Sequence, residues 1–223
     1  MRSKIISKYN LFPKDIKEAS LIQDLLKKDL VIKPMKIKPT LVAGVDASYR
    51  KGEIVGVYSL FKYPEMEIIE YSVSKVDVSF PYVPGYLSFR EGPAILSAMN
   101  KSRHKADVII FDGQGIAHPK GLGIASHIGV VLNLPTIGCA KSCLVGEYKG
   151  LGLERGAYVP LIYKKKMVGA VVRTRSGIKP LFISPGHLID IESSIEIILN
   201  CCKRYRLPEP IRHADRVSKL IEF

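Results

Sequence analysis

The sequence contains little cysteine, and its cysteines do not form a metal-binding pattern. The four cysteines combine a C-x3-C spacing with an adjacent pair, and neither spacing is usual for zinc: Cys139, Cys143, Cys201 and Cys202. A disulfide role is also disfavoured, because a chain of 223 residues buries enough surface to fold without cross-links. We therefore expect reduced, mostly buried thiols in a cytoplasmic protein.

Long apolar runs are absent as well. No stretch approaches the roughly 20 apolar residues that a membrane-spanning helix needs. The basic start of the chain leads into only a short apolar patch, so no secretory signal is expected. Asn and Gln total only six, which together with abundant Lys and Ile favours a protein that works at high temperature. A melting transition near mesophilic temperatures would contradict this last interpretation.

Acidic residues are too few to balance the basic ones. The chain has 21 Asp and Glu against 34 Lys and Arg, a formal net charge of +13. Such an excess favours a polyanionic partner, either nucleic acid or an anionic membrane surface. About half of it comes from residues 1–40, which form a basic flank beside a nucleic-acid site or simply a solvated helix face. The 47% hydrophobic and 25% charged residues are typical of globular proteins and exclude a mostly disordered chain.

The hydrophobic pattern predicts an α/β fold. Helical spacing over 14–30 is followed by three strands rich in Val, Ile and Tyr, whose short connections make them antiparallel: 41–49, 54–63 and 66–78. The remaining expected elements are a helix over 92–103, a buried strand over 108–111, a helix over 122–132, a buried strand over 135–139, a hairpin of 158–163 and 167–172, a strand over 181–184, a helix that Asp190 begins, and a helix over 214–221. This order predicts a mixed central sheet flanked by helices. No break in composition requires a second domain, so we expect a single domain over 1–223, with 1–40 as a basic helical extension.

Three carboxylates lie at positions that suggest a catalytic or metal-binding role. Asp46 is inside a strand, where carboxylates are disfavoured. Asp112 ends a buried strand, at the edge where open sheets bind ligands. Glu91 comes just before the predicted helix start at Gly92. Each also has a structural explanation: an ion pair for Asp46, a loop cap for Asp112, and for Glu91 a capping box with Ser88.

These carboxylates converge only if their strands are neighbours. Converging carboxylates repel one another unless they are protonated or bridged by a cation. Oxygen ligands alone suit Mg²⁺ or Mn²⁺. In a basic protein, this is the arrangement needed for phosphodiester cleavage, where one metal activates water and another stabilises the leaving oxygen.

Six long motifs connect these residues to a known family. They are VAGVDASY (42–49), PYVPGYLSFRE (81–91), DGQGIAHPKGLGIASH (112–127), GCAKS (138–142), SPGH (184–187) and RLPEPIRHAD (206–215). From about Leu41 to about Ser218, the chain resembles the endonuclease V family, the deoxyinosine 3′ endonucleases of the ribonuclease H-like superfamily. The resemblance implies a ribonuclease H-like mixed sheet, with three antiparallel strands plus parallel strands.

The resemblance also implies a set of metal ligands. Asp46, Glu91 and Asp112 match the family's metal-binding carboxylates, in agreement with the interpretation from the residues alone. Asp215 matches a fourth position on the C-terminal helix that is acidic or His in the family. His213 falls at a variable position, and no role is carried to it.

Lys141 follows a buried strand, and by itself it could be a solvated lysine. The resemblance implies that it is catalytic, as the cation that meets the scissile phosphate, a role suited to a point charge. The basic hairpin tip at 164–166, Arg173 and Arg175 are either contacts to the phosphate backbone or solvated basic turns.

The motif over 81–91 contains a stiff loop with an aromatic tip. Pro81, Tyr82, Val83 and Pro84 could form a proline-rich turn with the tyrosine packed inward. The resemblance instead implies a wedge, in which the prolines fix the backbone and push Tyr82 and Val83 into the duplex beside the damaged base. Arg90, in the same motif, is expected to bind substrate too.

The motif over 112–127 is rich in glycine, which suggests either a loose turn or a close approach to a ligand. The resemblance implies that Gly113, Gly121 and Gly123 let backbone groups close on a flipped base, with His118 at the same site. Hypoxanthine lacks the 2-amino group of guanine, so a tight pocket lined by backbone would admit hypoxanthine and reject guanine.

The resemblance therefore implies a Mg²⁺-dependent DNA repair endonuclease, with Mn²⁺ able to substitute. It would hydrolyse the second phosphodiester bond 3′ to deoxyinosine, leaving 3′-hydroxyl and 5′-phosphate ends. The alternatives are an inosine-specific endoribonuclease of the same family, another ribonuclease H-like nuclease such as a resolvase, and a non-catalytic nucleic-acid-binding module. The expected partner is DNA with deaminated bases or inosine RNA, not a membrane, and the protein is expected to be a cytoplasmic monomer.

Overall fold

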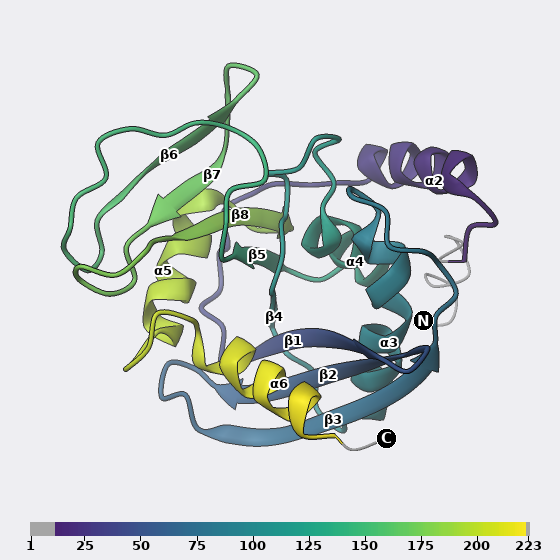
Figure 1. The fold of residues 1–223 in the computed structure, drawn as a ribbon. Helices are drawn as coiled ribbons and strands as arrows, with labels where there is room; N and C mark the ends of the chain where they lie inside the picture. Colours follow the sequence, from purple (N-terminus) through teal and green to yellow (C-terminus); the bar gives the residue numbers. More distant parts are fainter. Residues whose placement is uncertain (1–11, 222–223) are drawn as a thin grey trace.

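One eight-stranded sheet forms the centre of the protein, in the strand order β3-β2-β1-β4-β5-β8-β7-β6 (Figure 1). The structure is a computed structural model that describes residues 12–221. Its strands are β1 (Leu41–Arg50), β2 (Glu53–Lys62), β3 (Ile68–Asp77), β4 (Val108–Phe111), β5 (Thr136–Ala140), β6 (Tyr158–Tyr163), β7 (Lys166–Val172) and β8 (Leu181–His187). Its helices are α2 (Ile16–Lys28), α3 (Leu87–Lys101), α4 (Ile124–Leu132), α5 (Ile191–Cys201) and α6 (Glu209–Leu220).

The strand pairing confirms the predicted mixed sheet. β1, β2 and β3 are consecutive antiparallel neighbours, and β1, β4 and β5 are parallel neighbours. In the parallel pair, Val45 is the partner of Phe111. Asp46 and Asp112 are the next residues after these partners, so the register brings the two carboxylates to the same level on neighbouring strands.

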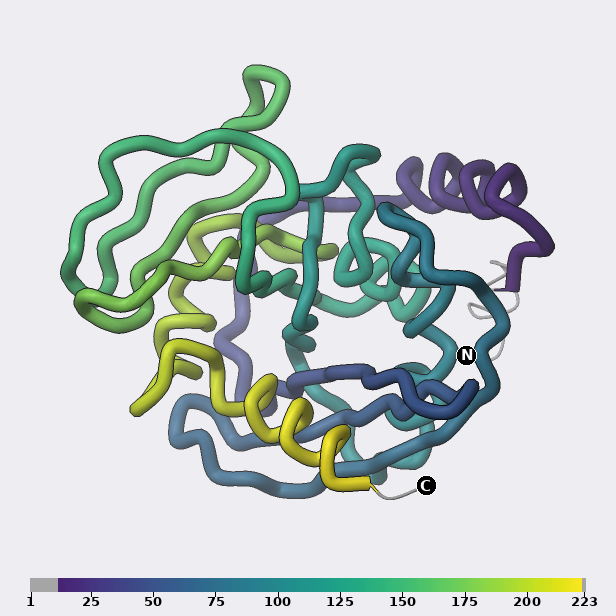
Figure 2. Tube along the Cα trace, viewed as in Figure 1, coloured from purple at the N-terminus to yellow at the C-terminus, as the bar shows by residue number. Residues whose placement is uncertain are grey.

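Helices cover both faces of the sheet. Side chains alternate along β1, so Ala43 and Val45 pack with α2, α3 and α4, while Val42 packs with α5 on the opposite face. On that opposite face α6 lies along β1 and β2 (Figure 2). Gly44 permits this approach, because a Cβ there would lie 2.3 Å from the backbone carbon of Pro210.

Helix α3 begins earlier than predicted, and the expected start at Gly92 is wrong. The helix starts at Leu87 and continues through Pro93. Proline removes one helical hydrogen bond. The helix is nevertheless held in place by its buried face, which includes Phe89 and Ile95. The capping box is also wrong, because Ser88 lies inside the helix and its hydroxyl bonds to His127 Nδ1 at 2.8 Å. Similarly, α6 starts at Glu209 rather than at residue 214.

Residues 1–11 of the predicted extension over 1–40 lie outside the described chain. Its described part, residues 12–40, packs against the domain. Helix α2 buries Ala19, Ile22 and Leu26 in the same cluster as α3 and α4. Beyond the helix, the backbone N–H of Val31 donates to His187 Nδ1 at 3.2 Å. This part of the chain is therefore more than a solvated basic flank.

The cysteines are free, and all except Cys143 are buried. Over residues 12–221, none of the helices is long and apolar enough to cross a membrane.

Glu70 on β3 ties the sheet to the end of α3, and its removal should cost stability in a pH-dependent way. Its carboxylate accepts hydrogen bonds from the Ser102 hydroxyl at 2.5 Å and from the His104 N–H at 2.9 Å. Desolvation raises the pKa of Glu70, but these bonds outweigh it and lower the pKa from 4.5 to about 2. The stabilisation is therefore complete above pH 4.5 and is lost as the pH falls through 2.

We expect Glu70→Gln to lower the free energy of unfolding at pH 7 by about 1–2 kcal/mol. Urea denaturation of both proteins from pH 7 downward would measure the difference, which should shrink as the pH falls below 4.5. A difference that is constant with pH would contradict the assigned role of the charge.

Candidate active site

All four predicted acidic residues take part in electrostatic interactions with one another. Burial, followed by the charges of Asp112 and Asp215, raises the pKa of Asp46 from 3.8 to about 6, against the opposing effects of Ser218 and Lys141. Burial also raises the pKa of Glu91 to about 8, and Asp46 and Asp112 add to the rise. Mutual repulsion of this kind is what a bound cation relieves.

The donor chemistry fits a hard divalent cation, although the side chains are not gathered around one point. All the candidate donors are carboxylate oxygens, which Mg²⁺ and Mn²⁺ prefer. Within residues 12–221, no three or more His, Cys, Asp or Glu side chains are grouped closely enough to hold a metal ion as they stand. Asp112 Oδ2 is in contact with the Lys141 ammonium. The predicted ligand set of Asp46, Glu91, Asp112 and Asp215 therefore stays a prediction.

Ser218 supports Asp46 and was missed by the sequence analysis. Its hydroxyl is fully buried and lies 2.8 Å from Asp46 Oδ2, to which it donates. The backbone carbonyl of Ser218 in turn accepts from the Ser48 hydroxyl at 3.0 Å. The available signal was the register of α6, because Ser218 follows Ile211 and Ala214 on the buried face.

We expect Ser218→Ala to lower the nicking rate by about tenfold, since Asp46 would lose a hydrogen bond to its charged form. If the carboxylates hold a divalent cation, its apparent affinity should weaken as well, which a titration of the rate with Mg²⁺ would measure. Ser102→Ala, at the C-terminal end of α3 and outside the candidate site, is a control that should keep the wild-type rate. Wild-type Mg²⁺ affinity and rate in Ser218→Ala would show that the bond is incidental.

Lys141 lies beside the carboxylates, and Arg206 holds its backbone. Burial lowers the pKa of Lys141, but the hydrogen bond to Asp112 and the charges of Asp112, Asp215 and Asp46 outweigh this and raise it. The Arg206 guanidinium donates to the Lys141 carbonyl at 2.9 Å and to the Pro180 carbonyl at 2.7 Å. Lys141 therefore presents a stable positive charge at the edge of the acidic residues.

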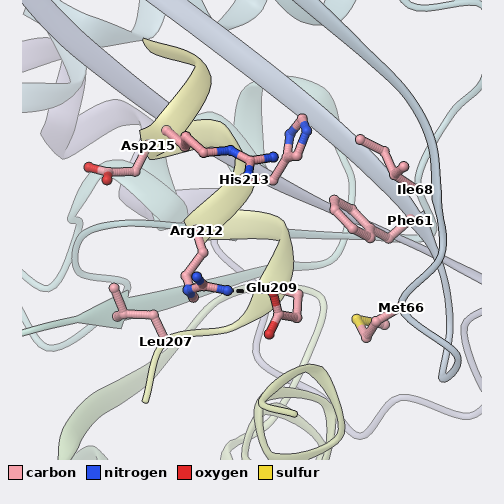
Figure 3. Close-up of a pocket in the computed structure, with 9 residues that line it drawn as sticks. Phe61, Met66, Ile68, Leu207, Glu209, Arg212, His213 and Asp215 are labelled. Atoms are coloured by element: carbon pink, nitrogen blue, oxygen red, sulfur yellow. Dashed lines mark hydrogen bonds and ion pairs between the residues drawn. The ribbon is translucent and has the colours of Figure 1, made fainter. Parts of the chain in front are cut away.

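A cavity of about 390 Å³ lies between α6 and the β2–β3 connection (Figure 3). His213 faces this cavity, with its Nδ1 2.9 Å from the Ser59 hydroxyl and its ring edge-on to Phe61. Asp215 projects from α6 away from Phe61 and pairs with Lys219 at 2.7 Å. His213 thus has a packing role, whereas Asp215, like Ser218 on the same helix, acts on Asp46.

A second cavity, of about 170 Å³, is formed by the two predicted recognition loops. Its lining includes Tyr82, Val83 and Pro84 from one loop and Gly113, Gln114, His118 and Gly123 from the other. Tyr82 is 70% exposed, so the inward-packed alternative for this side chain is wrong. Val83 packs against the core instead of standing free. Burial lowers the pKa of His118 to about 4, which leaves the ring neutral at pH 7.

Comparison with known proteins identifies the family. The sequence model of Endonuclease V matches residues 24–216. An endonuclease V of Dictyoglomus turgidum is 46% identical over 202 residues, covering 91% of this chain and 89% of the relative. The chain belongs to the endonuclease V family.

Solved structures of the family agree with the fold. The endonuclease V of Streptomyces avermitilis has a TM-score of 0.90 at 35% identity, covering 93% of both chains. That of Ciona intestinalis, in complex with a 24mer DNA containing an inosine followed by a ribo-adenosine, has a TM-score of 0.81 at 29% identity, covering 92% of this chain and 96% of that one. Membership in this family makes the protein a hydrolase that cleaves phosphodiester bonds of nucleic acids.

Some of the residues that were predicted to bind substrate make structural contacts instead. Arg90 donates to the Phe80 carbonyl at 3.0 Å and lies over the Tyr49 ring, so it holds the start of the Tyr82 loop. Gly121 is placed against Lys27 of α2 rather than in the cavity lining.

The suggested phosphate contacts of Arg173 and Arg175 are not favoured, because both guanidinium groups donate to backbone carbonyls. Arg173 reaches the carbonyl of Gly152, and Arg175 that of Arg204. The hairpin of β6 and β7 with its basic turn is as predicted.

Proposed function

We propose that this enzyme recognises deoxyinosine in DNA and, with Mg²⁺ bound, hydrolyses the second phosphodiester bond 3′ to it. The observation that carries the proposal is the register of β1 and β4, which sets Asp46 level with Asp112. Lys141 contacts Asp112 at the same place. Acidic and basic groups are thus combined as phosphodiester hydrolysis requires.

Each of these residues has a defined task in the proposal. Asp46, Glu91 and Asp112 would hold the divalent cation, with Asp215 close by, and Mn²⁺ would substitute for Mg²⁺. The cation supplies an activated water and stabilises negative charge on the phosphate and the leaving oxygen. Lys141 meets the scissile phosphate as a point charge, so that its positive charge stabilises the transition state. The products would carry 3′-hydroxyl and 5′-phosphate ends.

Base recognition is assigned to the cavity between the Tyr82 loop and the glycine-rich loop. Tyr82 is exposed at the tip of a proline-flanked turn, which suits insertion into a duplex. The neighbouring cavity joins the acidic residues through Gly113, which directly follows Asp112. The inosine-containing DNA bound by the Ciona intestinalis relative supports inosine as the base that is recognised.

Inosine in RNA is the second candidate substrate. The DNA bound by the Ciona intestinalis relative carries a ribo-adenosine directly after the inosine. The 2′-hydroxyl is the group that distinguishes RNA from DNA. A substrate with a ribonucleotide directly after the inosine should therefore be tested with this enzyme too. The monomeric state and cytoplasmic location stay predictions.

A nicking assay on labelled oligonucleotides tests the proposal. The substrates carry one inosine in DNA, in RNA, or in DNA followed by one ribonucleotide, and each is incubated with Mg²⁺, Mn²⁺ or EDTA. We expect metal-dependent nicking of the DNA at the second bond 3′ to inosine. Nicking of RNA alone would favour the endoribonuclease. Cleavage determined by junction shape would favour a resolvase, and binding of inosine DNA without cleavage would contradict the catalytic roles.

A further inference from the structure

Helix α2 contacts the Tyr82 loop through one buried side chain. Gln23 is only 1% exposed, and its Nε2 donates to the carbonyl of Gly85 at 2.8 Å. Gly85 has a φ of +86°, a conformation that glycine adopts without strain. The His118 ring also hydrogen-bonds to the Gly85 backbone. Gly85 is therefore the point where α2, the Tyr82 loop and the glycine-rich loop meet.

The same helix also holds the glycine-rich loop. The Lys120 ammonium donates to the Ser20 hydroxyl and lies 4.0 Å from Asp24 Oδ1. It also sits 5.6 Å from the centre of the Tyr86 ring, at the end of the Tyr82 loop. One helix face thus connects to both loops that line the cavity of about 170 Å³.

Stability alone does not account for glutamine at position 23. Its Oε1 is buried and, in the described structure, has no hydrogen-bond partner. An unsatisfied buried acceptor costs free energy, and an apolar side chain of the same shape avoids that cost. What the glutamine supplies is a fixed donor at the Gly85 carbonyl.

We propose that Gln23 is a positioning residue for base recognition: by holding the Gly85 carbonyl, it keeps the Tyr82 loop at the distance from His118 and Gly123 that the base requires. The inference rests on the proposed function, since it concerns the cavity assigned there to the damaged base. Part of the N-terminal extension then belongs to the recognition site and is not merely a basic flank.

The test compares the wild type with Gln23→Met, which keeps the length of the side chain and removes the donor. Leu25→Met, on the exposed side of the same helix, is the matched control. Dissociation constants for an inosine oligonucleotide and for the same sequence with adenine are measured in EDTA, and single-turnover nicking is measured with Mg²⁺. The ratio of the two dissociation constants is independent of the fraction of folded protein, so a merely structural role would not change it.

For Gln23→Met we expect the preference for inosine to fall by about five- to tenfold, the loss of one buried hydrogen bond, while the melting temperature stays equal or rises. Gln23→Leu, which also removes the donor, should reduce the preference by a similar amount, and it serves if the methionine variant does not fold. A wild-type preference that both variants retain within twofold would overturn the inference. A wild type without preference in binding or nicking would overturn the proposed function, and the inference with it.

Discussion

Replacing Asp112 with asparagine is expected to lower the nicking rate by at least about 10³-fold. Asparagine keeps the size of the side chain and one oxygen, but it removes the negative charge that faces Asp46 across β1 and β4. It also leaves Lys141 without its ionic partner. Asp46→Asn should have an effect of similar size, because it removes the other carboxylate at the same level of the sheet.

The stability of the Asp46→Asn variant should change in the opposite direction to its activity. Burial and neighbouring charges raise the pKa of Asp46 from 3.8 to about 6. Between these values the folded protein binds more protons than the unfolded chain, so wild-type stability falls as the pH rises through this window and stays lower above it. Asp46→Asn carries no such charge. In EDTA at pH 7, it should therefore be more stable than the wild type by about 1–2 kcal/mol.

Thermal melts from pH 4 to pH 8 and parallel nicking assays would measure both effects. Asp77→Asn, at the exposed end of β3, is a matched control that should change neither. An inactive Asp112→Asn variant that is also strongly destabilised would indicate a structural carboxylate. Nearly full activity in either variant would exclude that residue from the metal site.

The sequence was sufficient to predict the sheet and the position of its carboxylates. Three antiparallel strands followed by short apolar strands predict a mixed sheet, and the pairing of β1 with β4 was the one condition left open for Asp46 and Asp112 to meet. That condition depends on strand order, which is set by contacts between distant segments. The sequence indicated this strand order only indirectly, through the resemblance of its motifs to the family.

What the sequence did not predict depends on contacts between distant elements. The start of α3 was misplaced because Pro93 was taken as a residue of the first helical turn, whereas it lies inside the helix, where burial of the helix face outweighs the lost hydrogen bond. Ser218 and Gln23 resemble ordinary polar helix residues until Asp46 and Gly85 are placed next to them. Arg173 resembles a phosphate ligand until its carbonyl partners are known.

Lys141→Met is expected to lower the rate by about 10²-fold with a smaller effect on substrate affinity, because the lysine charge is needed most where negative charge develops on the phosphate. Lys141→Arg should recover part of the rate, since it keeps the charge but replaces a compact ammonium with a broad planar group. The neighbouring carboxylates raise the pKa of Lys141. Its loss of a proton should therefore not limit the rate between pH 7 and 9.

The position of Lys141 should matter as much as its charge. One terminal nitrogen of Arg206, Nη2, donates to both the Lys141 carbonyl and the Pro180 carbonyl, and Arg206→Met removes both hydrogen bonds. Arg206→Met should thus lower the single-turnover rate by about five- to tenfold, whereas Lys149→Met, an exposed lysine nearby in the chain, should not. If Lys141→Met retains the wild-type rate while Asp112→Asn is inactive, then Lys141 serves only as a counter-ion of Asp112, and the charge that meets the phosphate must come from another group.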